Sequence, residues 1–184
     1  MVAINPAPVS LCKDLLAGTS VHVGAAVGFP LGQSTPKVKK YEAVDAIANG
    51  ADEIDYVINI TQLKEKNYDF IEQEMAGIVE ECRGAGVISK VIFENCYLTE
   101  EEKRALCSIA REVHPDFIKT STGFGTGGAT FEDVALMKKC VGDEVKIKAA
   151  GGIADLKDAE DFVALGADRL GTSRIVKAVK AMEQ

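Results

Sequence analysis

Histidine is scarce in this chain of 184 residues, which carries only His22 and His114. The two lie far apart and form neither an HxH nor an HExxH pattern. Because catalytic zinc centres usually draw on closely spaced histidines, the sequence predicts no metal site. The five cysteines are also dispersed and form no CxxC pair, which is typical of reduced thiols in a cytoplasmic protein.

The chain also lacks an excess of basic residues, since its formal net charge is -7. Binding to nucleic acid phosphates requires a basic face, so we expect no nucleic-acid partner. No apolar run reaches the length of about 18 residues that a membrane span needs. The N-terminus has no basic start followed by an apolar core, so we predict no secretory signal, no membrane partner and a cytoplasmic location.

Short apolar runs that predict β-strands alternate with segments of helical spacing along the whole chain. The strand-like runs cover Val2–Asn5, Val21–Val27, Glu53–Ile58, Lys90–Glu94, Asp116–Lys119, Val145–Ala149 and Arg169–Gly171. The helical segments cover Lys37–Asn49, Asp69–Gly84, Thr99–Val113, Thr130–Cys140, Asp155–Ala164 and Ser173–Met182. Since no linker or charge block interrupts the alternation, we predict one domain over residues 1–184.

The alternation predicts a parallel sheet with crossover helices, either an open doubly wound sheet or a closed (β/α)8 barrel. Several strand-like runs end in a polar or charged residue, and some continue into a glycine loop, as in "FIKTSTG" and "KIKAAGG". In a barrel the loops after all strands converge on one mouth, whereas a doubly wound sheet uses one switch point. We therefore predict an α/β fold of the (β/α)8 TIM-barrel type, with seven strands present.

The glycines Gly123, Gly125 and Gly128 fit the G-x-G-x-x-G spacing of a dinucleotide-binding loop. That motif requires an acidic residue about twenty positions later, at the end of the next strand. The next strand, in "VKIKAAGG", carries Lys148 at that place. The fingerprint fails, and we predict no cofactor.

Two lysines, Lys119 and Lys148, lie near the ends of predicted buried strands, where apolar residues are expected. A lysine packed against the helices would be a costly unpaired charge, so the barrel interior near the mouth is the better location. Burial and a neighbouring cation both favour the neutral amine, which can attack a carbonyl and form a Schiff base. The strand carboxylate Asp55 could carry protons. We interpret Lys90 and Glu94 as a supporting ion pair.

Two late glycine loops predict an anion site. Gly151 and Gly152 precede a helix that starts near Asp155, and Gly171–Ser173 precedes the last helix. Glycine lets backbone N–H groups approach an anion, and the last two loops of a barrel often hold phosphate. Taken singly, such lysines are more often surface groups and such glycines more often turns.

The sequence resembles the 2-deoxyribose-5-phosphate aldolases, which are class I aldolases. The matching motifs are "VAINP" (2–6), "VGFPLG" (27–32), "GADEIDYVIN" (50–59), "KVIFEN" (90–95), "FIKTSTGFGTGGAT" (117–130), "KAAGGI" (148–153) and "RLGTSR" (169–174). The resemblance implies Lys119 as the Schiff-base nucleophile, Lys148 as the neighbour that perturbs it and Asp55 as the proton-relay carboxylate. It implies a substrate and phosphate site lined by Thr122, Gly123, Gly151, Gly152, Gly171, Thr172 and Ser173.

The reaction that the resemblance implies is the reversible cleavage of 2-deoxy-D-ribose 5-phosphate to acetaldehyde and glyceraldehyde 3-phosphate, without metal or cofactor. Members of this family begin with one more βα unit, which carries an "IDHTLL"-like motif. Because this sequence begins inside the second strand of that pattern, we expect a barrel without its first βα unit and self-association as a homo-oligomer. The alternatives are a catalytically impaired fragment and another phosphosugar barrel, such as an isomerase.

Overall fold

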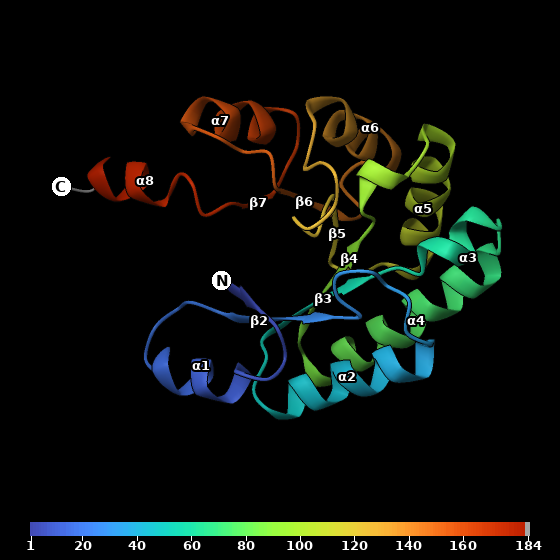
Figure 1. The fold of residues 1–184 in the computed structure, drawn as a ribbon, viewed down its shortest axis with the longest axis horizontal. Coiled ribbons are helices and arrows are strands. Elements are labelled where there is room, and N and C mark those ends of the chain that lie inside the picture. Colours follow the sequence, from blue (N-terminus) through green and yellow to red (C-terminus); the bar gives the residue numbers. More distant parts are fainter. Residues whose placement is uncertain (183–184) are drawn as a thin grey trace.

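A parallel sheet curls through the centre of the molecule, with helices around its outside (Figure 1). The computed structural model describes residues 1–182, except for the side chain of Lys177. Within them the sheet has seven strands, and each strand pairs in parallel with the next along the chain. They are β1 (Val2–Ile4), β2 (Val23–Val27), β3 (Glu53–Val57), β4 (Ile88–Ile92), β5 (Phe117–Lys119), β6 (Lys146–Ala150) and β7 (Arg169–Gly171).

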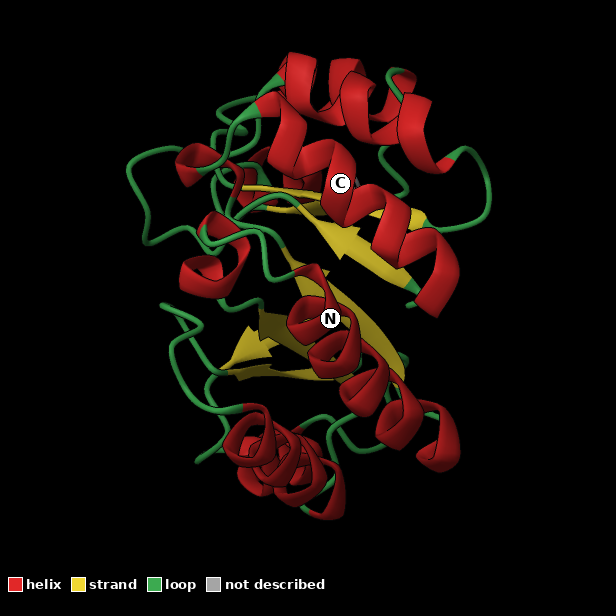
Figure 2. Ribbon diagram, turned by 90° about the vertical axis from the view of Figure 1, so that its right-hand side faces the viewer, coloured by secondary structure: helices red, strands yellow, loops and turns green. Residues whose placement is uncertain are grey.

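Helices connect successive strands and cover the outer face of the curled sheet (Figure 2). They are α1 (Val9–Leu15), α2 (Pro36–Ala48), α3 (Ile60–Lys64), α4 (Tyr68–Ala85), the 3-10 helix η1 (Asn95–Tyr97), α5 (Glu100–Val113), α6 (Phe131–Val141), α7 (Leu156–Ala164) and α8 (Val176–Met182). None of those in residues 1–182 combines the length and the apolar character needed to cross a membrane.

The predicted TIM-type barrel with seven strands is confirmed. The strand order follows the chain from β1 to β7, as right-handed βα repeats produce in a barrel. Within residues 1–182 no strand pairing joins β1 to β7, so the sheet stays open between these two edges.

The helical predictions differ from the structure at three places, the first of which is α3, a short helix that was not predicted. Helix α1 was missed because only Val9 of its seven residues is buried, while Leu11 and Leu15 are exposed, so no amphipathic pattern marks it. The last helix begins at Val176 and not at Ser173. The hydroxyl of Thr172 accepts the Arg174 N–H at 3.1 Å, which holds the preceding residues in a turn.

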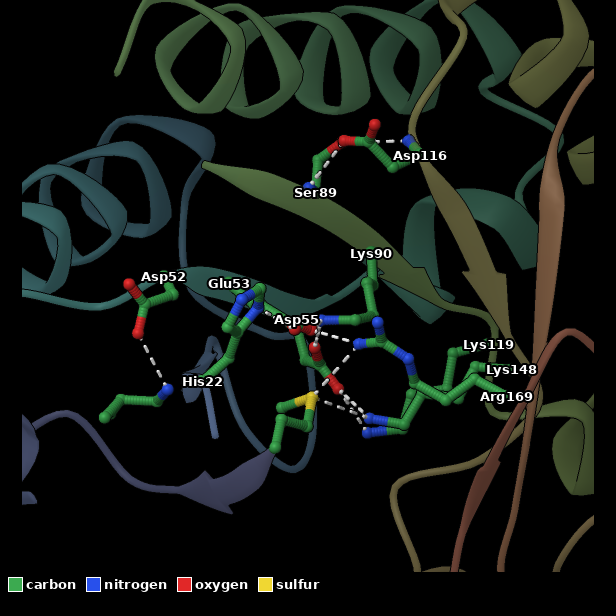
Figure 3. A network of polar contacts seen from close by, with 12 residues as sticks. His22, Asp52, Glu53, Asp55, Ser89, Lys90, Asp116, Lys119, Lys148 and Arg169 are labelled. Carbon is green, nitrogen blue, oxygen red and sulfur yellow. Dashed lines mark hydrogen bonds and ion pairs between the residues drawn. The ribbon is translucent and has the colours of Figure 1, made fainter. Parts of the chain in front are cut away.

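Alternation along the strands divides the sheet into two chemically different faces. Outward residues such as Ile54, Tyr56 and Ile118 are fully buried and belong to the hydrophobic core beneath the helices. Several of the residues between them, such as Asp55 and Lys119, carry charge and point into the interior of the curl (Figure 3). The apolar face thus stabilises the fold, and the inner face is left for polar groups.

A buried ion pair joins α2 and α4 to the carboxyl end of β3. The Lys39 ammonium donates to Glu74 Oε1 and to the carbonyl of Val57, both at 2.7 Å. The other Glu74 oxygen accepts the N–H of Asn59 at 3.0 Å. Burial lowers the pKa of Lys39 and raises that of Glu74, against the attraction between them. The pair therefore satisfies the backbone just beyond Asp55 and fixes the end of that strand.

Removing one member of this pair leaves the other charge buried without its partner. We expect Lys39→Met and Glu74→Gln each to lower the free energy of unfolding by about 3–5 kcal/mol, measured by urea denaturation. The matched control is Lys40→Met, which removes an exposed ion pair to Glu81 between the same two helices at the same 2.7 Å. Solvent screening makes that pair weak, so equal losses for Lys39→Met and Lys40→Met would contradict the prediction.

Candidate active site

Three lysines converge on one carboxylate inside the curled sheet (Figure 3). Asp55 Oδ2 accepts hydrogen bonds from Lys119 Nζ and from Lys148 Nζ, each at 2.8 Å. Asp55 Oδ1 accepts one from Lys90 Nζ at 2.6 Å. The exposed fractions of Asp55, Lys119 and Lys148 are 2%, 6% and 3%. The structure therefore brings together the three residues that the sequence indicated as catalytic candidates.

Strand register explains this convergence. Asp55 on β3 lies opposite Lys90 on β4, and Lys119 on β5 lies opposite Lys148 on β6. Residues in register on parallel strands point to the same face of the sheet. The curl then brings Asp55 within reach of Lys119 and Lys148, although β3 pairs directly with neither β5 nor β6.

The site holds a charged carboxylate beside an easily deprotonated amine. Burial alone would raise the pKa of Asp55, but the ammonium groups of Lys119, Lys90 and Lys148 outweigh it and hold that pKa well below its usual value. Burial lowers the pKa of Lys148 to about 8; Lys119 acts in the same direction, and Asp55 opposes it. At pH 7 roughly a tenth of the Lys148 side chains are therefore neutral. This lysine can exchange a proton near physiological pH.

The predicted ion pair between Lys90 and Glu94 is wrong. Lys90 binds Asp55 and Glu53 instead. The strand prediction ran to Glu94, whereas β4 ends at Ile92, and Glu94 has a left-handed backbone with φ of 57°. That conformation interrupts the alternation of the strand, so Glu94 does not continue the inward row of Lys90.

A cavity of about 750 Å³ opens at the mouth, over the two lysines. Its walls include Lys119 and Lys148 together with all the predicted substrate-binding residues, which are Thr122, Gly123, Gly151, Gly152, Gly171, Thr172 and Ser173. Asp55 is not among the lining residues and lies beneath the lysines. The walls also contain Arg169 and Arg174, which sequence reasoning did not assign to the site. Their cationic side chains flank the predicted "GTS" loop, and that position could have indicated them.

The loops that follow β5 and β6 pack backbone against backbone. A Cβ on Gly128 would lie 2.4 Å from the carbonyl carbon of Gly151, and one on Gly152 would lie 2.9 Å from the Ala129 oxygen. Gly151 and Gly152 also have φ of 71° and 75°. Only glycine fits these places without strain, so the two loops form one wall of the cavity together.

The described part of the chain, residues 1–182, contains no group of three or more His, Cys, Asp or Glu side chains that could hold a metal ion. The loop with the glycines of the G-x-G-x-x-G spacing does not open directly into a helix, because α6 starts only at Phe131.

Glu94 anchors the loop that carries Thr122 and Gly123. One carboxylate oxygen accepts the Thr122 N–H at 3.1 Å, and the other accepts the Thr122 hydroxyl in a short hydrogen bond. Glu94 is 2% exposed, and a Cβ on Gly125 would lie 3.2 Å from its carboxyl carbon. The loop therefore closes tightly over the carboxylate. Sequence reasoning missed this role because the two partners are 28 residues apart.

Comparison with known proteins places this chain in a family. The model of the DeoC/LacD family aldolases matches residues 2–167. The chain belongs to the DeoC/LacD aldolase family. It is 57% identical over 183 residues to the deoxyribose-phosphate aldolase of Lactobacillus acidophilus, covering 100% of this chain and 77% of that protein. It is 53% identical over 184 residues to the deoxyribose-phosphate aldolase of Bacteroides thetaiotaomicron, again covering 100% of this chain and 77% of that protein.

Solved aldolase structures share the fold of this family member. A structure described as "QR15, an Aldolase" superposes with a TM-score of 0.91 and is 40% identical, covering 99% of this chain and 81% of that one. A deoxyribose phosphate aldolase from Aeropyrum pernix, described as a tetramer, gives a TM-score of 0.88 and 30% identity, covering 99% and 76%. The predicted resemblance, the barrel fold and the class of aldolase-type lyase are confirmed at the level of the family. An isomerase or a non-catalytic fragment is not favoured.

We predict that Glu94→Ala releases the loop over residues 120–126. Losing both acceptors leaves the half-buried donors of Thr122 without protein partners, which costs up to about 1–3 kcal/mol of unfolding free energy. Hydrogen exchange followed by mass spectrometry should show more than about tenfold faster exchange in that segment, as expected when local opening becomes easier.

Glu94→Gln is the matched control for this prediction. Its carbonyl can still accept the Thr122 N–H, and its amide can donate to the Thr122 hydroxyl. We expect exchange near that of the unmodified chain. Equal exchange in the Ala variant and the unmodified chain would show that Glu94 does not hold the loop.

Proposed function

We propose that this chain cleaves 2-deoxy-D-ribose 5-phosphate reversibly to acetaldehyde and glyceraldehyde 3-phosphate through a Schiff base on Lys119. The observation that carries the proposal is the pair of buried lysines on one Asp55 oxygen at the floor of the cavity. Two amines so close in a dry site disfavour double protonation, and a neutral amine is the nucleophile that imine chemistry needs. The high identity to deoxyribose-phosphate aldolases supports the choice of substrate.

The steps follow from imine chemistry. The Lys119 amine attacks the C1 aldehyde carbon of the open-chain sugar, and loss of water gives a protonated imine. The C2–C3 bond then breaks as a base removes the proton of the C3 hydroxyl, and the electron pair moves to the imine as an enamine. C3 leaves as the aldehyde carbon of glyceraldehyde 3-phosphate. Protonation of the enamine at C2 and hydrolysis of the new imine release acetaldehyde and regenerate Lys119.

Lys148 is suited to the proton transfers of this sequence, whereas Asp55 is suited to hold the two amines rather than to relay protons as predicted. Lys148, with a pKa of about 8, can take the proton that Lys119 must lose before it attacks. Asp55 stays ionised and bonded to both amines, so it holds them in register and stabilises the protonated imine.

For the substrate phosphate we propose the glycine loops in the wall of the same cavity. Gly151 and Gly152 lie after β6, and Gly171–Ser173 lies after β7, with Arg174 beside them. Glycine loops offer backbone N–H groups to an anion, and Arg174 adds a positive charge. This placement puts the phosphate and the aldehyde of the substrate within one cavity.

We also propose a homo-oligomer and a cytoplasmic location for this family member. The edges β1 and β7 each have one strand neighbour within residues 1–182, and free strand edges favour pairing with another chain. One relative is described as tetrameric. All five cysteines are free thiols, as in proteins of a reducing compartment.

The first test of this function is trapping of the imine. Incubation with acetaldehyde and borohydride should add one reduced adduct to the peptide that contains Lys119, identified by mass spectrometry. Lys119→Met should abolish the adduct, whereas Lys146→Met, which removes an exposed lysine near the opposite end of the barrel, should leave it unchanged. An adduct found only on Lys148 would reverse the roles of the two lysines, and no adduct on either would refute the mechanism.

The second test concerns Lys148. Lys148→Leu removes the cation beside Lys119 and leaves Asp55 hydrogen-bonded to Lys119. We expect slower imine trapping at pH 7 and a pH profile moved upwards by roughly one unit, with the fold intact by circular dichroism. A profile that stays in place would show that Lys148 does not act through its charge.

A further inference from the structure

A second layer of charge lies directly below the candidate site. Glu53 precedes Asp55 by two residues on the inward face of β3 and is 1% exposed. Its Oε2 accepts from Arg169 at 2.5 Å and from Lys90 in a short ion pair, and its Oε1 lies 2.7 Å from His22 Nδ1 (Figure 3). None of the roles described so far uses this carboxylate.

Lys90 connects the two layers. Its ammonium binds Glu53 Oε2 on one side and Asp55 Oδ1 on the other, and the side chain is fully buried. Neither Lys90 nor Glu53 is among the residues that line the cavity within the described chain, so neither is placed to touch a substrate there. By occupying Oδ1, Lys90 leaves only Oδ2 of Asp55 to the two site lysines.

Cations outnumber carboxylates in this interior. The charged groups around the two layers are Glu53 and Asp55 from β3, Lys90 from β4, Lys119 from β5, Lys146 and Lys148 from β6, Arg169 from β7, and His22, which directly precedes β2. Lys146 is exposed and His22 is half-exposed, whereas the groups between them are mostly shielded from solvent. Without Glu53, a single carboxylate would face Lys90, Lys119, Lys148 and Arg169.

We propose that Glu53 is a positioning residue for the imine chemistry: by holding Lys90, it fixes Asp55 with one oxygen turned to both site lysines and balances the charge beneath them. This inference rests on the proposed function. It assigns the glutamate in "GADEIDYVIN" to the site indirectly, through Lys90, and it predicts effects of opposite sign for the two members of the Glu53–Lys90 pair.

The two variants change the protonation of the site amines in opposite directions because they remove charges of opposite sign. Glu53→Gln keeps the length of the side chain and removes a negative charge, so the site amines lose their protons more readily. Lys90→Met removes a positive charge and frees Asp55 Oδ1, so the same amines hold their protons to higher pH. The combined variant removes both charges and should lie close to the unmodified chain.

The experiment measures amine protonation directly on the full chain. Lys119 and Lys148 are labelled with formaldehyde and cyanoborohydride at a series of pH values, and methylation of each peptide is quantified by mass spectrometry. We expect the pH midpoint of labelling to move down by about one unit in Glu53→Gln and up by about one unit in Lys90→Met. The control Asp52→Asn removes the adjacent carboxylate, which instead binds the exposed side chain of Lys13, and should leave the midpoint in place.

The outcomes separate this inference from the proposed function, because labelling needs no aldolase turnover. Midpoints that shift as expected, with no acetaldehyde adduct on Lys119, would support the role of Glu53 in the charge layer and refute the proposed reaction. Midpoints that do not move, or that move in the same direction in both variants while circular dichroism shows an intact fold, would overturn the role of Glu53. If Glu53→Gln does not fold, the upward shift in Lys90→Met decides, and its absence overturns the proposal.

Discussion

The carboxylate of Asp55 is the interaction on which the interior of this barrel depends. Three ammonium groups lie within 2.6–2.8 Å of its two oxygens, on strands that are separate in the chain. Without that negative charge, Lys90, Lys119 and Lys148 would repel each other in a space shielded from water, at a cost that a domain of this size could hardly absorb. The same arrangement that makes the lysines tolerable inside the fold keeps one of them close to deprotonation.

Stability and reactivity are divided between the ends of the strands. Beneath Asp55, Glu53 pairs with both Lys90 and Arg169, and Lys90 also pairs with Asp55. Above it, Gly151 and Gly152 form one stretch of the cavity wall from backbone alone, because they carry no side chain. A charged floor beside this glycine wall agrees with the proposed substrate, which carries both an aldehyde and a phosphate.

The alternation of strands and helices and the position of the reactive residues could be predicted from the sequence. A lysine such as Lys119 in a run that is otherwise apolar departs from the pattern that burial imposes, and that departure marks a site. The capping box at Thr99 and Glu102 gave the start of α5 in the same local way. Helix α1 was not predicted because its apolar residues Leu11 and Leu15 are exposed, so the sequence shows no amphipathic pattern there.

Sequence alone determined the strands and most of the helices and indicated candidate residues for the chemistry, because alternation and helical spacing are local properties of the chain. Only the tertiary structure decided the partners. The sequence suggested that Lys90 pairs with the nearby Glu94, yet Lys90 meets Asp55 and Glu53, 35 and 37 positions away, while Glu94 holds Thr122. Ion pairs in a barrel interior form across the curl between strands, and the side chain that fills a given space there depends on register and curvature, which no short stretch of sequence contains.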